Sequence, residues 1–288
     1  MRITHPDRVV YPDTGITKAR VARYYAAIAT RILPHLRSRP AVLVRCPDGI
    51  GSECFYQKHV ASWAPASLRR VRIREKAKTG EYLVVEDRAG LVGLIQMGVL
   101  EIHTWNAQAD GLERPDRVVF DLDPAPDVPW QAVVGAARRV RSGLEERGLR
   151  SFVKTTGGKG LHVVAPIRPG PSWAECIEFT RTVTDALVAE TPDAFTATMA
   201  KSARTGKIFI DYFRNQRGAT SVAAYSTRAR PGAPVSVPLT WDELEKVPSG
   251  SHFSLELVER RLARLTSDPW ASYRRLAQSL PSPRPRPR

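Results

Sequence analysis

Residues 117–165 constrain the fold more than any other stretch of the chain. The apolar run 117–123 predicts a strand, which the prolines after it bring to an end. Residues 130–147 carry apolar side chains at helical spacing with Gly148 as a stop signal, and 152–154 return to a strand. A strand, a helix and a second strand in this order form a crossover unit. We therefore predict an α/β (α+β) fold.

The remaining chain adds helices and strands without an internal repeat. A helix with a threonine N-cap is expected over 17–36, and another, opened by a capping box, over 172–190. Segment 91–101 is apolar but ambiguous in its period. Further strands are expected at 41–44, 82–85, 163–165, 207–213 and 221–225, with two short helical patterns beyond 241. We predict one domain over 1–275 and a disordered Pro/Arg tail over 276–288.

Asp121 and Asp123 are the acids of the first predicted strand. Residues i and i+2 of a strand point to the same face, so both carboxylates project from one side. Their mutual repulsion is relieved when a hard divalent cation lies between them. Asp211 is a further acid in an apolar strand, which is costly unless it is paired or binds a metal. Because two acids at this spacing are common, a strand end that binds nothing is the alternative.

The segment 154–162 places two glycines and Lys159 after a strand. This predicts a turn whose backbone N–H groups face an anion, with the lysine adding a charge. The spacing is not that of a P-loop, and Gly160 stands where a serine or threonine is needed. The alternative is a glycine-rich hairpin with an exposed lysine, followed by a strand-end histidine, His162. Downstream, 225–230 is expected to be extended, with two arginines on one face suited to triphosphate oxygens.

The composition favours a polyanionic partner. The 288 residues hold 44 Lys+Arg against 29 Asp+Glu, a net charge of +15, which suits nucleic acid; a generally basic proteome is the alternative. We expect no signal peptide and no membrane span, which needs about 18 apolar residues. Cys46, Cys54 and Cys176 form no C-x-x-C pair, so we expect no disulfide framework, no zinc knuckle and a reduced, cytoplasmic setting. A zinc site from Cys46, Cys54 and His59 lacks a fourth ligand.

Three carboxylates, a glycine-lysine turn, a histidine and paired arginines together suit one type of reaction. Two metal ions about 3.5–4 Å apart can be bridged by such carboxylates, activate a 3′-hydroxyl and neutralise a leaving pyrophosphate. The basic groups would hold a triphosphate.

Several segments of the chain resemble those of a known family. From Thr4 to about Trp270 it is similar to the polymerase domain of bacterial ligase D, a member of the archaeo-eukaryotic primase superfamily. The segments that carry the resemblance are 4–12, 93–105, 121–123, 157–162 and 204–211. Their order and spacing are more specific than any one of them. The resemblance implies a primase-like catalytic core at about 116–240, with a mixed central sheet flanked by helices, and an end-binding part at about 1–115.

The resemblance also implies a role for individual residues. The metal-binding catalytic acids would be Asp121, Asp123 and Asp211. The nucleotide would be bound by His103, Thr156, Gly158, Lys159, His162 and Arg228. Arg8 and Lys18 would bind a 5′-phosphate across a gap, and Phe55 and Tyr56 would stack on the template. Three positions depart from the commoner pattern: Thr156 replaces serine, Arg8 replaces lysine and Tyr56 replaces phenylalanine. Lys18 lies in the first turn of the predicted helix, where exposed N–H groups favour an anion.

The implied activity is template-directed nucleotidyl transfer by a DNA/RNA primase-polymerase. It would fill in or extend DNA ends in non-homologous end joining, prefer ribonucleotides, and use two Mn²⁺ (or Mg²⁺) ions. The implied partners are gapped or 3′-overhanging DNA ends with a 5′-phosphate, NTP or dNTP, the end-binding protein Ku and a DNA ligase domain or protein, in the nucleoid of the cytoplasm.

Two other functions are open at this stage. The strand 118–123 imitates the nucleophile strand of haloacid-dehalogenase-type phosphatases, but Ala125 stands where that family needs threonine or valine. A DNA-end-binding module without catalysis would be free to lose the three acids, which are all present. Primer extension with and without divalent metal distinguishes these alternatives from a polymerase.

Overall fold

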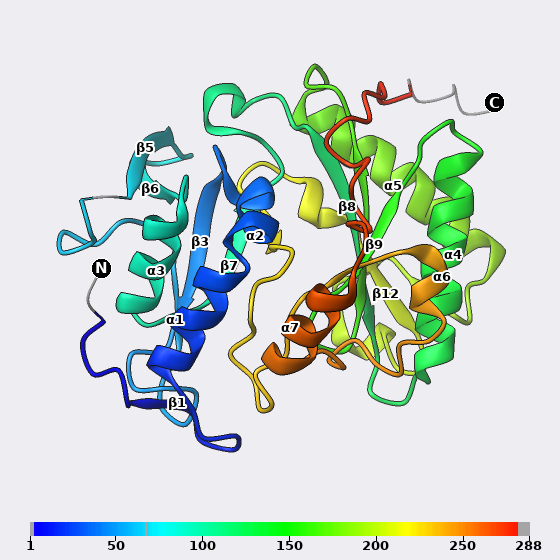
Figure 1. Ribbon diagram of the computed structural model, residues 1–288. Helices are drawn as coiled ribbons and strands as arrows, with labels where there is room; N and C mark the ends of the chain where they lie inside the picture. The colour runs from blue at the N-terminus through cyan, green and yellow to red at the C-terminus, as the bar shows by residue number, and fades with distance from the viewer. Residues whose placement is uncertain (1–2, 67, 282–288) are drawn as a thin grey trace. The chain divides into compact units, whose positions relative to one another are not determined.

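The computed structural model describes residues 3–66 and 68–281, and it divides into two compact units (Figure 1). The first unit comprises Met1–Trp105, Thr220–Val237 and Ser251–Leu265, and the second comprises Asn106–Ala219, Pro238–Gly250 and Thr266–Arg288. The functional division into parts at about 1–115 and 116–240 stays a prediction, and the first compact unit also contains 220–237 and 251–265. The chain returns to the first unit because β13 (Thr220–Val222) pairs with β7 (Val99–Trp105).

The first unit is built on an antiparallel sheet with the order β13-β7-β3-β6-β5, and β4 pairs with β3. The remaining strands are β3 (Pro40–Arg45), β4 (Phe55–Gln57), β5 (Arg69–Arg74) and β6 (Thr79–Val84), with a separate pair, β1 (Val9–Tyr11) and β2 (Ile16–Thr17). The helices are α1 (Lys18–Ala27), α2 (Ala29–Leu36), α3 (Arg88–Gln96) and α7 (Leu255–Arg264).

Two predicted elements of the first unit are each divided in the structure. The expected helix over 17–36 is two helices, because the backbone at Ile28 leaves helical geometry. Its predicted N-cap is confirmed: the Thr17 hydroxyl accepts the N–H of Arg20 at 3.2 Å. The ambiguous segment 91–101 is the end of α3 and the start of β7, separated by Gly98 at φ +78°, a conformation that suits glycine.

The second unit contains the mixed sheet that the sequence predicted, in the order β11-β12-β8-β10-β9-β14. Its strands are β8 (Arg117–Pro124), β9 (Phe152–Thr155), β10 (Leu161–Pro166), β11 (Phe195–Thr196), β12 (Ile208–Asp211) and β14 (Pro238–Leu239). The helices are α4 (Trp130–Glu145), α5 (Trp173–Glu190) and α6 (Trp241–Leu244). The crossover β8-α4-β9 is confirmed, with β10 inserted between its two strands, and α4 and α5 lie side by side (Figure 1).

The C-terminal segment packs against the second unit up to the end of the described residues. Leu276 contacts the cluster of Trp270 and Tyr273, and the Gln278 side chain donates to the carbonyls of Arg150 and Pro166, each at 2.8 Å. These contacts do not fit a disordered tail that begins at 276. Residues 282–288 lie outside the described residues, where the prediction of disorder stays a prediction.

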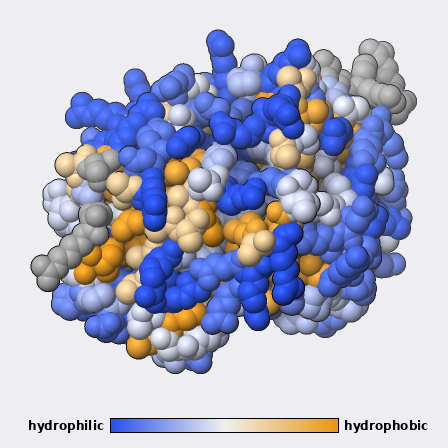
Figure 2. Space-filling model, in the orientation of Figure 1, coloured by the Kyte–Doolittle hydropathy of each residue, from blue (hydrophilic) through white to orange (hydrophobic). Residues whose placement is uncertain are grey.

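The surface fits the composition of the chain. Hydrophilic side chains cover most of the face drawn in Figure 2, as expected for a net charge of +15. In the part of the chain that the structure describes, no helix combines the length and the apolar character needed to cross a membrane.

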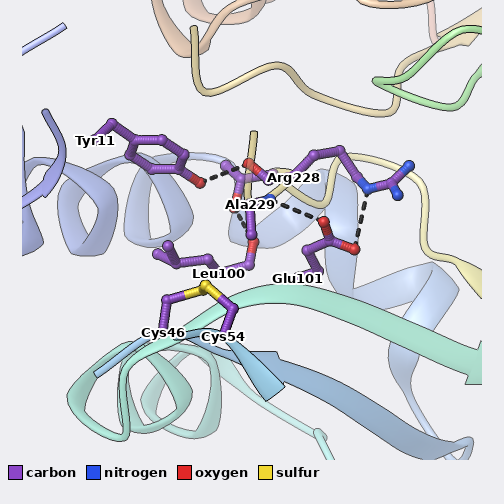
Figure 3. Close-up of a disulfide and its surroundings, with 8 residues drawn as sticks. Tyr11, Cys46, Cys54, Leu100, Glu101, Arg228 and Ala229 are labelled. Carbon is purple, nitrogen blue, oxygen red and sulfur yellow. Dashed lines mark hydrogen bonds and ion pairs between the residues drawn. A yellow bond between two sulfur atoms is a disulfide. The ribbon is translucent and has the colours of Figure 1, made fainter. Parts of the chain in front are cut away.

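A disulfide joins Cys46 to Cys54, contrary to the expectation from the sequence (Figure 3). Cys46 follows β3 and Cys54 precedes β4, and the antiparallel pair of Arg45 and Phe55 brings the next two positions together. The C-x-x-C pattern does not detect this pair, because its eight-residue separation is bridged by a strand pairing. The alternative zinc site is also wrong, since both sulfurs are bonded and His59 contacts Glu75 at 2.9 Å.

Reduction of this disulfide is expected to lower the free energy of unfolding by about 2–3 kcal/mol, because a closed loop of this length restricts the unfolded chain. Urea denaturation with and without dithiothreitol measures the change. The double variant Cys46→Ser/Cys54→Ser is the control, since reductant should not alter its stability. If dithiothreitol left the free energy of unfolding of the wild-type protein unchanged, no disulfide would be formed.

Candidate active site

A row of polar side chains crosses the sheet of the second unit. In strand register, Asp211 of β12 lies opposite Asp121 of β8, Asp121 lies opposite His162 of β10, and His162 lies opposite Lys154 of β9. Residues opposite one another in a sheet point to the same face, and Asp123 shares that face because it is two residues from Asp121. The structure therefore brings together the three acids and the histidine that the sequence singled out.

The neighbouring row of the same face is apolar and covered. Val119, Val164 and Phe152 lie opposite one another in register, and the rings of Trp270 and Tyr273 pack on them. Asp121 and Asp123 lie two and four residues further along β8 than Val119, where exposure increases: the side chain of Asp121 is 16% exposed and that of Asp123 is 55% exposed. The polar row therefore begins where the apolar cover ends.

Two arginines that the sequence reasoning did not single out neutralise the acids. The Nε of Arg214 lies 3.1 Å from Asp121 Oδ2 and 3.1 Å from Asp211 Oδ2. Arg204 Nη1 lies 3.4 Å from Asp123 Oδ2, and its guanidinium stacks over the Phe209 ring. Asp211 is also the last residue of β12, because its carboxylate accepts the N–H of Phe213 and begins a 3-10 turn. The strand predicted over 207–213 thus ends early and brings Arg214 back to the acids.

The acids differ in their protonation. Burial alone would raise the pKa of Asp121, but the adjacent His162 and Arg214 hold it well below its ordinary value. Burial raises the pKa of Asp211 to about 6 against the opposing charge of Arg214, and burial and the charge of Asp121 raise that of Asp123. Burial and the charge of Lys154 lower the pKa of His162 to about 4, so this histidine is neutral at pH 7.

The glycine-lysine segment is a hairpin between β9 and β10. The Thr156 hydroxyl donates to the Gly160 carbonyl at 3.0 Å and accepts the N–H of Gly158 at 3.2 Å. The N–H of Gly157 donates to Gly250, a residue that the sequence analysis missed and whose α-carbon packs against the hairpin backbone. The N–H groups of Gly157 and Gly158 therefore donate to acceptors within the fold. In the expected anion-binding turn, these groups would face an anion instead. Lys159 is exposed, and its charge acts on Asp123.

The donor set suits a divalent metal, although no ion site is formed as the side chains stand. Within residues 3–66 and 68–281, no three His, Cys, Asp or Glu side chains are grouped closely enough to hold an ion. Between Asp121 and Asp211 lies the Arg214 guanidinium, a cation in the position where the carboxylates need positive charge. Carboxylate oxygens from two paired strands are ligands that a hard divalent ion prefers. An ion bound by these acids would take the position of the Arg214 guanidinium.

A second group of candidate residues lies in the first unit around Glu101. This carboxylate accepts from His103 Nε2 at 2.8 Å and contacts Arg228 Nε at 3.0 Å, as Figure 3 shows for Arg228. It also accepts the N–H of Ala229 at 2.8 Å. Although burial opposes ionisation, His103 and Arg228 lower the pKa of Glu101 to about 2. Glu101 was missed by the sequence analysis, but a buried acid in the apolar strand β7, two residues from His103, was the available signal.

The segment that carries Arg228 turns rather than extends. Tyr225 has φ +66°, and the N–H of Arg230 bonds to the carbonyl of Arg228 at 2.9 Å. The expected pair of arginines on one extended face is therefore wrong, and Arg228 takes its direction from Glu101.

Arg8 and Lys18 are adjacent, but the structure changes the argument for them. The first N–H groups of α1 are bonded: Lys18 N–H to Arg8, Ala19 N–H to Pro6, and Arg20 N–H to Thr17. The expectation of exposed N–H groups at this helix end is wrong, so an anion here would be bound by side chains.

Arg8 contacts Asp48 at 2.7 Å, and the buried ammonium of Lys18 donates to carbonyls of residues 4 and 96. Burial and the charge of Arg8 lower the pKa of Lys18.

Phe55 and Tyr56 lie on β4 at the surface of the first unit. Phe55 is 41% exposed and Tyr56 is 70% exposed. The Tyr56 ring centroid is 6.0 Å from that of His103, so one expected template-stacking residue lies beside one expected nucleotide-binding residue.

Comparison with known proteins identifies the family. The family model described as "LigD, primase-polymerase domain" matches residues 17–270. The chain belongs to this family. Primase-polymerases are nucleotidyltransferases, so the chain belongs to that class of enzyme, and the phosphatase alternative is wrong.

Similar proteins include complete LigD proteins and a solved polymerase domain. The chain is 42% identical over 274 residues to the multifunctional non-homologous end joining protein LigD of Pseudomonas aeruginosa, and 38% identical over 265 residues to that of Mycolicibacterium smegmatis. These matches cover 95% and 91% of this chain, which spans about a third of each relative's length (33% and 34%). The solved polymerase domain of Mycobacterium tuberculosis ligase D in complex with DNA matches with a TM-score of 0.89 at 33% identity, covering 95% of this chain and 97% of that one. The expected primase-like fold is confirmed.

Proposed function

We propose that this domain adds nucleotides, opposite a template strand, to the 3′ ends of broken DNA during non-homologous end joining. The observation that carries the proposal is the register of the second unit's sheet, which sets Asp211 opposite Asp121 with Asp123 on the same face. Three acids in that arrangement, in a LigD polymerase domain, suit two-metal nucleotidyl transfer.

The family is metal-dependent, and in this chain Asp121, Asp123 and Asp211 would hold the ions, Mn²⁺ or Mg²⁺. Bound there, the ions would help deprotonate the 3′-hydroxyl and neutralise the leaving pyrophosphate. His162 is neutral and lies 3.3 Å from Asp121 Oδ1, so it orients that carboxylate without competing through its charge. Lys159, exposed beside Asp123, supplies a mobile positive charge for phosphate.

We assign the other nucleotide contacts to the residues that the resemblance names. Arg228 would bind the triphosphate, held in place by Glu101, and His103 would contact the sugar and underlie a preference for ribonucleotides. Thr156 and Gly158 would act through the hairpin, whose shape the Thr156 hydroxyl maintains.

The DNA would be recognised by the first unit. Phe55 and Tyr56 offer exposed rings for the template, and Arg8 and Lys18 offer charge for the 5′-phosphate of a gap. Because the curated relatives are about three times as long as this chain, work beside a ligase domain and Ku, in the nucleoid, belongs to this proposal.

The proposed activity is tested on a gapped duplex with each NTP and dNTP, in Mn²⁺, in Mg²⁺ and with chelator. We expect metal-dependent addition of the nucleotide complementary to the template. Addition of nucleotides that are not complementary to the template base, or addition in the presence of chelator, would contradict the proposal.

The 5′-phosphate pair makes a separate prediction. A downstream phosphate should tighten binding of a gapped duplex by about tenfold, since a charge-assisted contact is worth about 1.5–3 kcal/mol and Arg8 must leave Asp48 to form it. The double variant Arg8→Ala/Lys18→Ala should lose this difference and still extend an ordinary primer–template. Titrations of both duplexes at one salt concentration measure it. Equal affinity of the wild-type protein for both duplexes would rule out the pocket.

A further inference from the structure

The first unit exposes a third large aromatic side chain that the proposed function does not use. Trp63 is 56% exposed, and it lies eight residues after Phe55. Elsewhere among the described residues, the large apolar side chains that are exposed are Val9 and Met199, neither of them aromatic. Exposed rings gathered in one segment are typical of an interaction surface.

Arg45 joins Trp63 and Phe55 into one stack. Its guanidinium carbon lies over both rings, 4.4 Å from the Trp63 centroid and 5.1 Å from the Phe55 centroid. Two hydrogen bonds hold it there: Nε donates to the Met97 carbonyl at 2.7 Å, and Nη1 donates to Gln57 Oε1 at 3.0 Å. The guanidinium lies over the Trp63 ring, and Trp63 nevertheless remains 56% exposed.

The backbone around Trp63 holds the ring at the surface. A turn is closed by the N–H of Ala64, which bonds to the carbonyl of Ala61 at 3.0 Å, and Ala64 itself is only 6% exposed. Arg70 of β5 donates to the Ala64 carbonyl at 3.2 Å and ties the turn to the sheet. Trp63 is therefore displayed from an anchored turn beside a basic strand.

We propose that Trp63, with Arg45 and Phe55, forms a stacking surface for unpaired bases of a single-stranded nucleic acid. This inference rests on the proposed template-directed function, to which it adds a binding position beyond Phe55 and Tyr56. Rings interleaved with guanidinium beside a positive strand are the combination that binds single strands with little sequence preference. The exposed arginines of β5 are Arg69, Arg70, Arg72 and Arg74. Their charge favours a phosphate backbone over a neutral protein surface.

Tryptophan fluorescence gives a direct test, because a base stacked on an exposed indole quenches its emission. Trp63 is the exposed tryptophan among the described residues, whereas Trp105, Trp173 and Trp270 are buried and Trp130 and Trp241 are half-buried. The wild-type protein is titrated with single-stranded oligo(dT) at fixed salt, without nucleotide or metal. We expect quenching on binding, and affinity about 5- to 150-fold weaker in Trp63→Ala. Trp63→Phe should keep the affinity within about threefold and lose the quenching, since either ring stacks.

A matched charge variant separates stacking from general attraction. Arg72→Ala should lower the salt dependence of binding while leaving the quenching amplitude unchanged, since it removes a phosphate contact alone. Unchanged affinity in Trp63→Ala, or wild-type binding without quenching, would overturn the proposal. Emission that changes with protein concentration alone would assign the surface to a second copy of the chain, which also overturns it.

The two proposals fail separately. If the wild-type protein binds and quenches but never extends a gapped duplex, the polymerase function fails and the stacking surface stands. If extension is normal while Trp63→Ala binds oligo(dT) as tightly as wild type, the polymerase function stands and the stacking surface fails.

Discussion

Replacing Asp121 by alanine is expected to lower the rate of templated nucleotide addition by about a thousandfold or more. Asp121 is the central acid of the polar row, opposite both Asp211 and His162, so its loss removes a ligand from the proposed metal positions. Charge stabilisation by a bound metal is worth several kcal/mol in the transition state, and about 4 kcal/mol corresponds to three decades in rate. Single-turnover extension of a gapped duplex under saturating nucleotide measures the effect.

The control removes the same charge at an unrelated position. Asp193 is exposed on the same unit, and Asp193→Ala should extend the primer at the wild-type rate. DNA affinity should be unchanged or slightly higher in Asp121→Ala, since a negative charge is lost. The Asp121→Ala variant should remain folded, because Arg214 retains Asp211 as its partner. Thermal melting checks this. Extension near the wild-type rate in folded Asp121→Ala would refute the catalytic assignment.

The acids should also act as a unit. If Asp121 and Asp211 share bound ions, the double variant Asp121→Ala/Asp211→Ala should be hardly slower than either single variant, since residues that act together give strongly non-additive losses. Rates that multiply instead would mean that the two carboxylates contribute independently.

The polar row of the second unit was predictable from the sequence because its information is local. Alternation along 117–123 places Asp121 and Asp123 on one face, and the proline-terminated strand with its helix and return strand predicts the crossover. The capping box of Ser172 and Glu175 also forms as expected, because its two residues are three positions apart. Patterns within one element depend on few other parts of the chain.

The features that were missed depend on pairings between distant segments. Glu101 meets Arg228 across 127 positions, and no local pattern links a strand acid to an arginine in a later turn. The bond between Cys46 and Cys54 requires the register of β3 and β4. The α1 N–H groups are bonded to residues 6 and 8, which fold back onto the helix start. The strand register, and the way in which distant segments fold back onto one another, are set by packing of the whole unit. The spacing of residues in the sequence does not encode them.

Gly160→Ala is expected to lower the free energy of unfolding by about 3 kcal/mol or more and to slow nucleotide addition together with it. A Cβ at this position would lie 1.9 Å from the Leu122 carbonyl oxygen and 3.0 Å from its carbon, so β10 and β8 could not keep their spacing. Overpacking against a side chain costs about 1–3 kcal/mol, and here the obstacle is backbone that cannot rotate away. Gly160 has an ordinary negative φ, so the effect would be steric alone.

The position of this obstacle links stability to chemistry. Leu122 lies between Asp121 and Asp123, so a displacement of its carbonyl would rotate both carboxylates away from their shared position. Gly170→Ala is the matched control, since a Cβ there meets nothing within 4 Å, and it should leave both stability and extension unchanged. Urea denaturation and single-turnover extension at a temperature where Gly160→Ala remains folded measure the two effects. If Gly160→Ala were as stable and as active as Gly170→Ala, the strands would not be as close as described, and the glycine would serve only the turn.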